Sequence, residues 1–413
     1  MGRFFVTFAC CSALLIDSAA PVDAADTIKL ALIEPFSGAF ALQGETSLHH
    51  IQMAVDAINA AGGVLGGRKI ELRAFDNKGS AQEALIALKQ ATDQDIRFVM
   101  QGVGVHVAHA LLEAIAKHNE RSPEQPVLYL NYSAPDPALT NEKCNFWHFR
   151  FDSHTDMKLD VLTTALARSA NTRRVYLINQ DYAYGQRISR VGKEMLAKKR
   201  PDVEIVGDEL HPLGKIKDFA PYVAKIKASG ADTVLTGNWG NDLSLLIRAG
   251  GEAGLQVTYY TLYANLNGMA RAIDPAGKDR VKNVANWYVN VSDSRLEAFY
   301  LAYKRKYNED WLFPPSKFAI DMFAHAVSAA GSADPLKVAR MLEGMRFDAG
   351  TGEIWMRPDD HQIIQPLYVA TLTRADGREV KYDFENTGLG WRVDMRVESK
   401  DTALPTTCKM ERP

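Results

Sequence analysis

The sequence predicts an α/β protein built from two doubly wound α/β lobes in tandem. Short apolar runs of strand length alternate with segments whose apolar residues recur at helical spacing, a pattern typical of parallel sheets covered by helices on both faces. The alternation occurs twice, before and after an aromatic-rich stretch at residues 146–152. The chain has 413 residues, of which 46% are apolar, so it can bury two separate cores.

The first βαβ unit is the clearest local signal. A strand at residues 28–33 leads into a helix that ends at Gly62-Gly63, because glycine adopts the left-handed backbone of a helix C-terminus without a Cβ clash. A turn containing Gly66-Gly67 follows, and then a strand from Ile70 in which apolar and charged residues alternate. Because this turn joins the end of a helix to the start of a strand, we expect it at the end of the sheet opposite to any ligand.

The remaining elements of the two lobes continue the same alternation, and residues 146–152 are expected to lead out of the first sheet. The predicted strands are residues 98–102, 127–132, 174–179, 203–210, 233–237 and 257–262, and the predicted helices are residues 80–92, 106–118, 156–169, 184–199, 219–229 and 242–251.

The C-terminal third contains too many elements to be an appendix of the second lobe. We therefore expect the chain to cross between the lobes again, so that each lobe is built from separate segments. The predicted elements are an extended stretch at 281–289, helices at 296–307, 316–330 and 335–345, and strands at 353–356 and 366–373. The expected division is a first lobe of residues 26–148 completed by about 290–348, a second lobe of 149–287 completed by about 349–375, and a tail of 376–413 near the hinge.

Composition and targeting signals limit the function classes. The formal net charge is −2, which leaves no electrostatic footprint for nucleic acid or an anionic membrane. Residues 1–25 have the pattern of a signal peptide, with one arginine, a short apolar run and small residues before the expected cleavage position. No later stretch is apolar and long enough to span a membrane, so we expect an exported, soluble, periplasmic monomer. An uncleaved membrane anchor is the alternative.

Four cysteines are present, and two of them leave with the predicted signal peptide. The remaining pair, Cys144 and Cys408, predicts one disulfide in an oxidising compartment. Such a bridge fixes the C-terminal tail to the segment around Cys144. Two free buried thiols are the alternative.

Catalytic and metal-binding patterns are missing from the sequence. It has no G-x-S-x-G elbow, no H-E-x-x-H pair and no phosphate-binding loop, so we expect neither an enzyme nor a cofactor. His106 and His109 lie three residues apart on a predicted helix, but no third ligand falls at matching spacing, so we expect no metal site. Residues 359–361 are expected in an exposed turn.

Several motifs resemble those of the leucine/isoleucine/valine-type periplasmic binding proteins, the type I substrate-binding proteins of ABC importers. They include NAAGGVLGGRKIEL around the glycine turn, NYSAPDPALT from Asn131, NQDYAYGQ from Asn179 and DFAPYVAKIKASGADTVLTG from Asp218, and together the resemblance covers almost the whole chain after the signal peptide. It implies two lobes joined by a multi-strand hinge, a ligand cleft between them, and delivery of a small-molecule carboxylate to an ABC permease. Family members carry branched-chain or other hydrophobic amino acids, and a subset carries aromatic carboxylates.

Ligand loops are expected where the predicted strands end, because open α/β sheets bind ligands beyond the carboxyl ends of their strands. In the first lobe, the loop that contains Gly104 leads into a helix, and its N–H groups and the helix dipole suit a carboxylate. His106 stands where the family has a small hydroxyl residue. It either donates a hydrogen bond to the ligand or is an ordinary polar residue at a helix start.

The next first-lobe loop contains Tyr132, Ser133 and Ala134. By the resemblance, it presents backbone N–H groups and a hydroxyl to the carboxylate and amine of the ligand. Pro135 stands where many relatives have a hydroxyl residue, and proline has no backbone donor. This departure argues against the usual contacts to an amino-acid head group.

The second lobe is expected to contribute Tyr182, Tyr184, Trp239 and Tyr263. Tyr263 stands near the place where branched-chain amino acid binders have an acidic residue for the ammonium of the ligand. A buried ammonium without a carboxylate partner is costly, whereas aromatic side chains stack on planar rings. We therefore expect an aromatic carboxylate rather than leucine. A periplasmic sensor that passes its ligand state to a partner protein is the alternative function.

The acids nearest to the predicted ligand loops are Asp136, Asp181 and Asp242. They are the candidates to replace the missing acidic partner of an ammonium group, although none of them is in the expected register.

Overall fold

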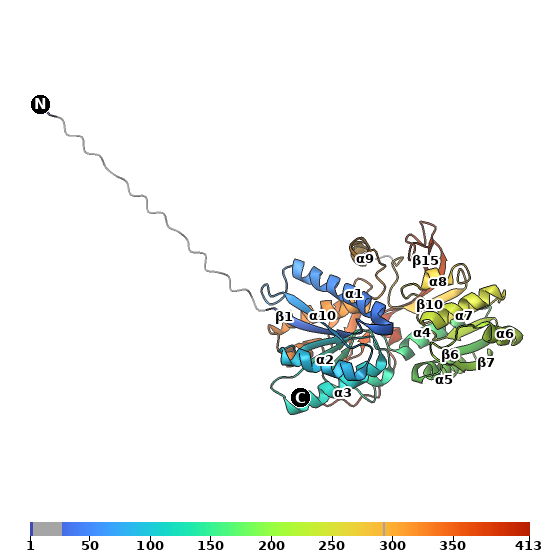
Figure 1. Ribbon diagram of the computed structural model, residues 1–413, viewed down its shortest axis with the longest axis horizontal. Helices are drawn as coiled ribbons and strands as arrows, with labels where there is room; N and C mark the ends of the chain where they lie inside the picture. Colours follow the sequence, from blue (N-terminus) through green and yellow to red (C-terminus); the bar gives the residue numbers. More distant parts are fainter. Residues whose placement is uncertain (3–26, 292–293) are drawn as a thin grey trace.

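The computed structural model describes residues 1–2, 27–291 and 294–413. It contains two α/β lobes, the first on the left and the second on the right in Figure 1. Almost all of the predicted signal peptide falls on residues 3–26, which lie outside the described residues. In the part of the chain that is described, no helix combines the length and the apolar character needed to cross a membrane.

The first lobe is built on a five-stranded parallel sheet with the strand order β2-β1-β3-β4-β5. Four of these strands lie where they were predicted. The fifth is a correction, because part of the aromatic-rich stretch at residues 146–152 forms the edge strand of this sheet before the chain leaves it. The strands are β1 (Ile28–Glu34), β2 (Ile70–Asp76), β3 (Phe98–Gln101), β4 (Leu128–Asn131) and β5 (His148–Arg150).

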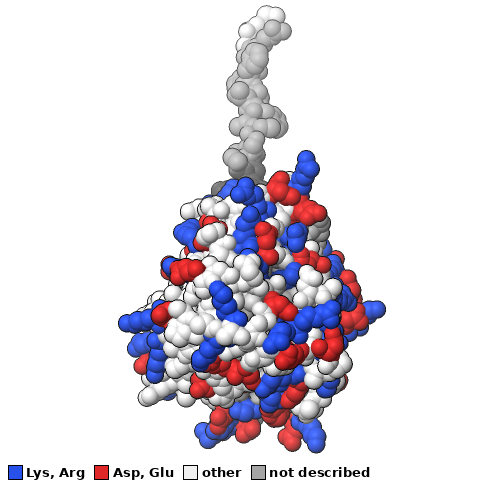
Figure 2. Space-filling view, turned by 90° about the vertical axis from the view of Figure 1, so that its right-hand side faces the viewer, with Lys and Arg blue, Asp and Glu red and all other residues white. Residues whose placement is uncertain are grey.

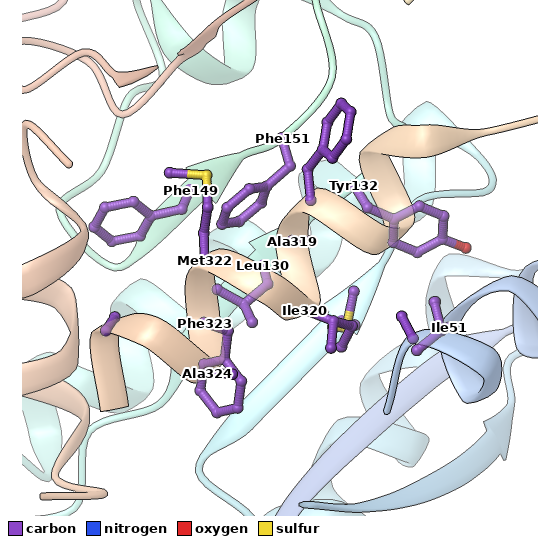
Figure 3. Packing of buried hydrophobic residues seen from close by; sticks show 14 of the residues in the cluster. Ile51, Leu130, Tyr132, Phe149, Phe151, Ala319, Ile320, Met322, Phe323 and Ala324 are labelled. Atoms are coloured by element: carbon purple, nitrogen blue, oxygen red, sulfur yellow. The ribbon is translucent and has the colours of Figure 1, made fainter. Parts of the chain in front are cut away.

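Helices cover both faces of the first sheet, because successive side chains of a strand point to opposite faces. On one face, Leu30 and Leu130 of the sheet pack with Phe323 of α10 in one apolar cluster (Figure 3). On the other face, Ala31 and Val99 pack with α2 and α3. The helices of this lobe are α1 (Ala41–Ala60), α2 (Ala81–Asp93), α3 (Val105–Arg121), α9 (Ser294–Tyr307), α10 (Pro314–Ala330) and α11 (Pro335–Leu342), with the short 3-10 helices η1 (Gly38–Phe40) and η2 (Pro137–Thr140).

The second lobe is built on a seven-stranded sheet with the order β15-β14-β10-β9-β8-β6-β7. β14 is antiparallel to both of its neighbours, β10 and β15, and all other pairs of neighbouring strands are parallel. The strands are β6 (Arg174–Gln180), β7 (Glu204–His211), β8 (Thr233–Thr236), β9 (Thr258–Thr261), β10 (Val281–Ala285), β14 (Leu367–Arg374) and β15 (Leu389–Val397). The helices are α4 (Thr155–Arg168), α5 (Ala183–Lys199), α6 (Ala220–Ala228), α7 (Gly240–Glu252) and α8 (Met269–Ile273).

The chain passes between the lobes in the connections β5–α4, β10–α9 and β13–β14. A small antiparallel sheet precedes the last of these, and its Ile354 and Ile363 pack into the core of the first lobe. Asp359 lies exposed in a turn, as expected for residues 359–361, but the expected exposure is wrong for the other two: Asp360 is 1% exposed and His361 0%. The small sheet consists of β11 (Arg346–Asp348), β12 (Glu353–Met356) and β13 (Ile363–Ile364).

The C-terminal segment spans both lobes. β15, in the segment assigned from sequence to a tail near the hinge, is an edge strand of the second sheet, and α12 (Ser399–Thr402) follows it. The last residues then return to the first lobe, where Cys408 forms a disulfide with Cys144. Arg412 forms an ion pair with Glu343 at 2.8 Å, and the guanidinium of Arg340 on α11 donates to the carbonyl of Pro413.

Basic and acidic side chains are interspersed over the face shown in Figure 2. This mixture agrees with the formal net charge of −2 and gives that face no extended basic field for a polyanion.

Candidate functional site

Four aromatic residues predicted for the ligand site come together in the second lobe. Tyr182, Trp239 and Tyr263 follow the neighbouring strands β6, β8 and β9, and Tyr184 lies in the first turn of α5. The indole Nε1–H of Trp239 donates to the hydroxyl of Tyr182 at 2.9 Å. The ring centroids of Tyr182 and Tyr184 are 5.8 Å apart, and those of Tyr184 and Tyr263 6.0 Å apart. Parallel strands explain this meeting, because their carboxyl ends share one edge.

The same rings approach the first lobe at two points, once directly and once through a shared cation. The ring of Phe40, in η1, lies 6.2 Å from that of Trp239. The ammonium of Lys158 lies 6.0 Å from the ring centroid of Tyr263 and 5.8 Å from that of Phe313, the residue before α10. We call Phe40, Tyr182, Tyr184, Trp239, Tyr263 and Phe313 the interlobe aromatic cluster.

A buried polar pair supports the second-lobe part of this cluster. Gln180, the last residue of β6, donates to a carboxylate oxygen of Asp242 at 2.8 Å and to the carbonyl of Trp239 at 3.3 Å. These bonds join the ends of β6 and β8. Burial raises the pKa of Tyr182 to about 12, so its hydroxyl is protonated at neutral pH and can both donate and accept hydrogen bonds.

Gly104 and His106 do not join the cluster through any described contact. Gly104 is the N-cap residue of α3 and has a φ of 97°, in the region that favours glycine. His106 is exposed, and its Nε2–H donates to the carbonyl of Gly79 at 2.9 Å. The imidazole therefore anchors the loop after β2 through one nitrogen and leaves the other for solvent or a ligand.

Glu34 occupies the first-lobe loop that was expected to bind a carboxylate. It is the last residue of β1 and is fully buried. Its carboxyl group accepts from the backbone N–H groups of Gly102 at 2.6 Å and Val103 at 3.2 Å, and from the hydroxyl of Tyr132. Burial raises the pKa of Glu34 from 4.5 to about 8 against the opposing effect of these hydrogen bonds.

Tyr132, Ser133 and Ala134 are also committed to contacts inside the first lobe. The Tyr132 ring lies in the core and its hydroxyl end points away from Phe149 and Phe151 (Figure 3). The backbone N–H groups of Ser133 and Ala134 donate to the side-chain oxygen of Asn131 at 3.1 and 2.8 Å. These two N–H groups are engaged inside the lobe, whereas no described hydrogen bond engages the Ser133 hydroxyl, so a ligand contact of this loop stays a prediction that depends on that hydroxyl.

The three acids considered as ammonium partners have other contacts. Asp136 forms an ion pair with His109 at 2.7 Å, and exposed Asp181 accepts from Gln186 at 2.9 Å. Asp242 accepts from Gln180, as described above.

Glu34 and the buried pair of Asp152 and Lys158 were not predicted from the sequence. Glu34 had a usable signal, because it is an acid at the carboxyl end of an otherwise apolar strand.

Among the described residues, no group of three or more His, Cys, Asp or Glu side chains lies close enough together to hold a metal ion.

Comparisons with known proteins agree on one family. Residues 27–378 match the family model described as "Periplasmic binding protein". The chain is 31% identical over 417 residues to the Leu/Ile/Val-binding protein homolog 4 of Brucella abortus, covering 98% of this chain and 97% of that protein.

Solved structures show the same fold. The leucine-, isoleucine-, valine-, threonine-, and alanine-binding protein from Brucella ovis, in a closed conformation, superposes with a TM-score of 0.87 at 29% identity, covering 94% of this chain and 100% of that one. A solute-binding protein of an ABC transporter from Rhodopseudomonas palustris, in complex with 3,4-dihydroxy benzoic acid, has a TM-score of 0.75 at 19% identity and coverages of 90% and 98%.

Proposed function

The chain belongs to the periplasmic binding protein family, and from this premise we propose that it serves a branched-chain amino acid-type ABC importer. It captures a small carboxylate between its lobes in the periplasm and delivers it to the membrane permease. The protein itself catalyses no reaction; the ATPase of the transporter supplies the energy.

The interlobe aromatic cluster supports an aromatic carboxylate as the ligand. Four of its rings follow neighbouring elements of the second lobe. From the first lobe, Phe40 lies beside Trp239, and Phe313 lies near the Lys158 ammonium that also neighbours Tyr263. Ring faces and edges suit a planar ligand, and the tyrosine hydroxyls can bind its polar substituents. The similarity to Leu/Ile/Val-binding protein homologues supports the transport class, and leucine is the competing ligand.

Hinge closure is the proposed mechanism. The interlobe contacts of Phe40 with Trp239 and of the Asn267 amide with the Thr46 hydroxyl at 3.0 Å belong to a closed arrangement. A ligand held by both lobes stabilises this arrangement, and closing excludes water and strengthens the polar contacts. The closed protein presents surfaces of both lobes to the permease.

Thermal-shift measurements with two ligand panels test the proposal, because a ligand that binds the native state raises its stability by mass action. We expect benzoates, cinnamates or phenylpyruvate to raise the melting temperature more than leucine, isoleucine or valine. Stabilisation by the aliphatic amino acids alone would contradict the aromatic ligand and keep the transport role. Stabilisation by neither panel, at millimolar concentrations, would contradict both.

A further inference from the structure

A buried ion pair lies at the inner end of the interlobe aromatic cluster. The Lys158 ammonium is 2.6 Å from a carboxylate oxygen of Asp152, and the two side chains are 4% and 1% exposed. Asp152 follows β5 in the first connection between the lobes, and Lys158 lies on α4 of the second lobe. A buried charge is costly without a partner, so this cation is held at this position by Asp152.

The surroundings of the pair include rings from both lobes. Tyr263 of the second lobe and Phe313 of the first lobe lie about equally far from the ammonium, at 6.0 and 5.8 Å. Asp152 occupies one of the three N–H donors of the ammonium. Lys158 is therefore a cation placed where the aromatic surfaces of the two lobes meet.

Four backbone donors of the first-lobe loops are already engaged by side chains of the protein, so a buried cation such as Lys158 can supply the charge partner that a ligand carboxylate needs. Glu34 takes the N–H groups of Gly102 and Val103, and Asn131 takes those of Ser133 and Ala134. These four donors are engaged inside the protein.

We propose that Lys158 determines specificity for the ligand by binding its carboxylate, and that the ligand is an aromatic monocarboxylate without an ammonium group. This inference rests on the proposed function and names the group that recognises the ligand charge. The ligand carboxylate approaches the remaining donors of Lys158 while its ring packs against Tyr263 and Phe313. Asp152 stays with Lys158, and it competes with the ligand for the positive charge.

Binding of benzoate and its neutral analogue benzamide to the purified protein, measured by isothermal titration calorimetry, tests the assignment. The native protein should bind benzoate more tightly than benzamide. Lys158→Met should weaken benzoate binding at least about tenfold and leave benzamide little changed, because only the charged ligand loses a partner. Lys158→Arg should retain most of the preference for benzoate.

Two further variants complete the design. Asp152→Asn removes the competing negative charge, and its amide oxygen can still accept a hydrogen bond from Lys158 and hold it in place, so the variant should keep or increase the affinity for benzoate. The control is Lys199→Met, since Lys199 is another second-lobe lysine that pairs with an aspartate, Asp160, at 2.8 Å. It is 25% exposed, against 4% for Lys158, and has no described contact with the cluster. This control should bind benzoate as the native protein does.

The outcomes separate this inference from the function on which it rests. Unchanged benzoate affinity in a folded Lys158→Met variant would overturn the role of Lys158. If that variant does not fold, equal native affinities for benzoate and benzamide, or loss of benzoate binding in Asp152→Asn, would overturn it. Native binding of leucine without benzoate would overturn the monocarboxylate assignment and leave the transport function intact. Native binding of no hydrophobic amino acid and no ring-bearing acid would overturn both.

Discussion

At the scale of single residues, Glu34 gives the folded protein a pH-dependent stability term. Its pKa is about 8 in the folded chain against an ordinary value of 4.5, because burial disfavours the charged form. Between these two values the unfolded chain releases the proton and the folded chain keeps it. The contribution of Glu34 to stability is therefore complete below about pH 4.5 and is lost as the pH rises towards 8.

Glu34→Gln should remove this term, because the amide is neutral at every pH and keeps one acceptor oxygen for Gly102 and Tyr132. The free energy of unfolding of the variant, minus that of the native protein, should increase by about 2–4 kcal/mol between pH 5 and 8. Urea unfolding at several pH values measures this difference. Taking the difference cancels the contribution of the buried histidines to the pH dependence of stability, because that contribution is the same in both proteins. Glu71→Gln, on partly exposed β2, is the control. A constant difference across this range would contradict the assignment.

Trp239→Ala should weaken the binding of a ring-bearing ligand about tenfold, corresponding to about 1–2 kcal/mol. The change removes the indole, its hydrogen bond to Tyr182 and its contact with Phe40. Titration calorimetry with the ligand identified by thermal shift measures the effect. Trp355→Ala is the matched control, since Trp355 is another half-buried tryptophan, on β12 beside Arg346. Equal affinities of the two variants would remove Trp239 from the site.

Residue-level prediction worked better in the second lobe than in the first. Tyr182, Trp239 and Tyr263 follow neighbouring parallel strands, so strand ends alone bring them together. The first-lobe loops required knowledge of long-range partners: Glu34 lies 68 residues before Gly102, to which it bonds, and 98 before Tyr132. A sequence pattern shows which backbone N–H groups exist, but it does not show which distant side chain will occupy them.

At the scale of elements, the glycine turn before β2 tolerates a side chain less well at Gly63 than at Gly66. Gly63 has a φ of 74°, and a Cβ at this position would clash with the backbone oxygen of Arg68. Gly66 has a similar φ of 76°, but open space surrounds its Cβ position. A substitution at Gly66 therefore tests backbone strain alone, whereas one at Gly63 tests backbone strain together with a steric clash.

Gly66→Ala should destabilise the protein by about 1 kcal/mol, the cost of a left-handed backbone for an L-residue. Gly63→Ala should cost at least about 3 kcal/mol, because the turn must also open. Thermal unfolding of both variants measures the difference. Similar losses of stability in the two variants would show that the turn relieves the clash at residue 63 by a shift that costs little free energy. Ligand affinity should stay unchanged in both, since this turn lies at the opposite end of the sheet from the aromatic cluster.

Long periodic elements were predicted well and short ones were missed. The helices around α3, α5 and α10 were predicted because a dozen or more residues repeat the apolar period. β5 has three residues and β13 has two, too few to show any period. β15 has nine residues, but only its first part is buried, so an alternating pattern is weak.

At the scale of the whole molecule, the presence of two lobes could be predicted from the sequence, but the chain segments that make up each lobe could not. The strand–helix alternation appears twice because each lobe is a doubly wound sheet. The later crossings depend on contacts between segments far apart in sequence, such as Ile354 of β12 in the core of the first lobe. The signals for these contacts are apolar side chains of ordinary types, which do not specify the lobe in which they are buried.

Ligand binding should make the molecule more compact in solution. Phe40 contacts Trp239 and Thr46 contacts Asn267 across the lobes, and a ligand touching both lobes adds to these contacts, so it shifts the population towards the closed form. Small-angle scattering should show a smaller radius of gyration with a saturating ligand. Asn267→Ala should reduce the compaction of the free protein more than that of the complex. Identical profiles with and without a tight ligand would contradict hinge closure.

The disulfide makes the C-terminal tail a covalent part of the first lobe. Cys144 and Cys408 are 264 residues apart, and the chain between them includes the whole second lobe. Cys408→Ser should lower the free energy of unfolding by up to about 4–5 kcal/mol, because the unfolded chain regains the freedom of a very long loop. Denaturant unfolding with and without reductant measures the loss. Reduced native protein should match the variant, and the variant should not respond to reductant. In the Cys408→Ser variant, the ion pair of Arg412 with Glu343 still holds the C-terminal tail. The double variant Cys408→Ser, Arg412→Ala should therefore unfold with a lower free energy than Cys408→Ser alone. Equal stability of the oxidised native protein and Cys408→Ser would show that the tail contacts alone fix this end of the chain.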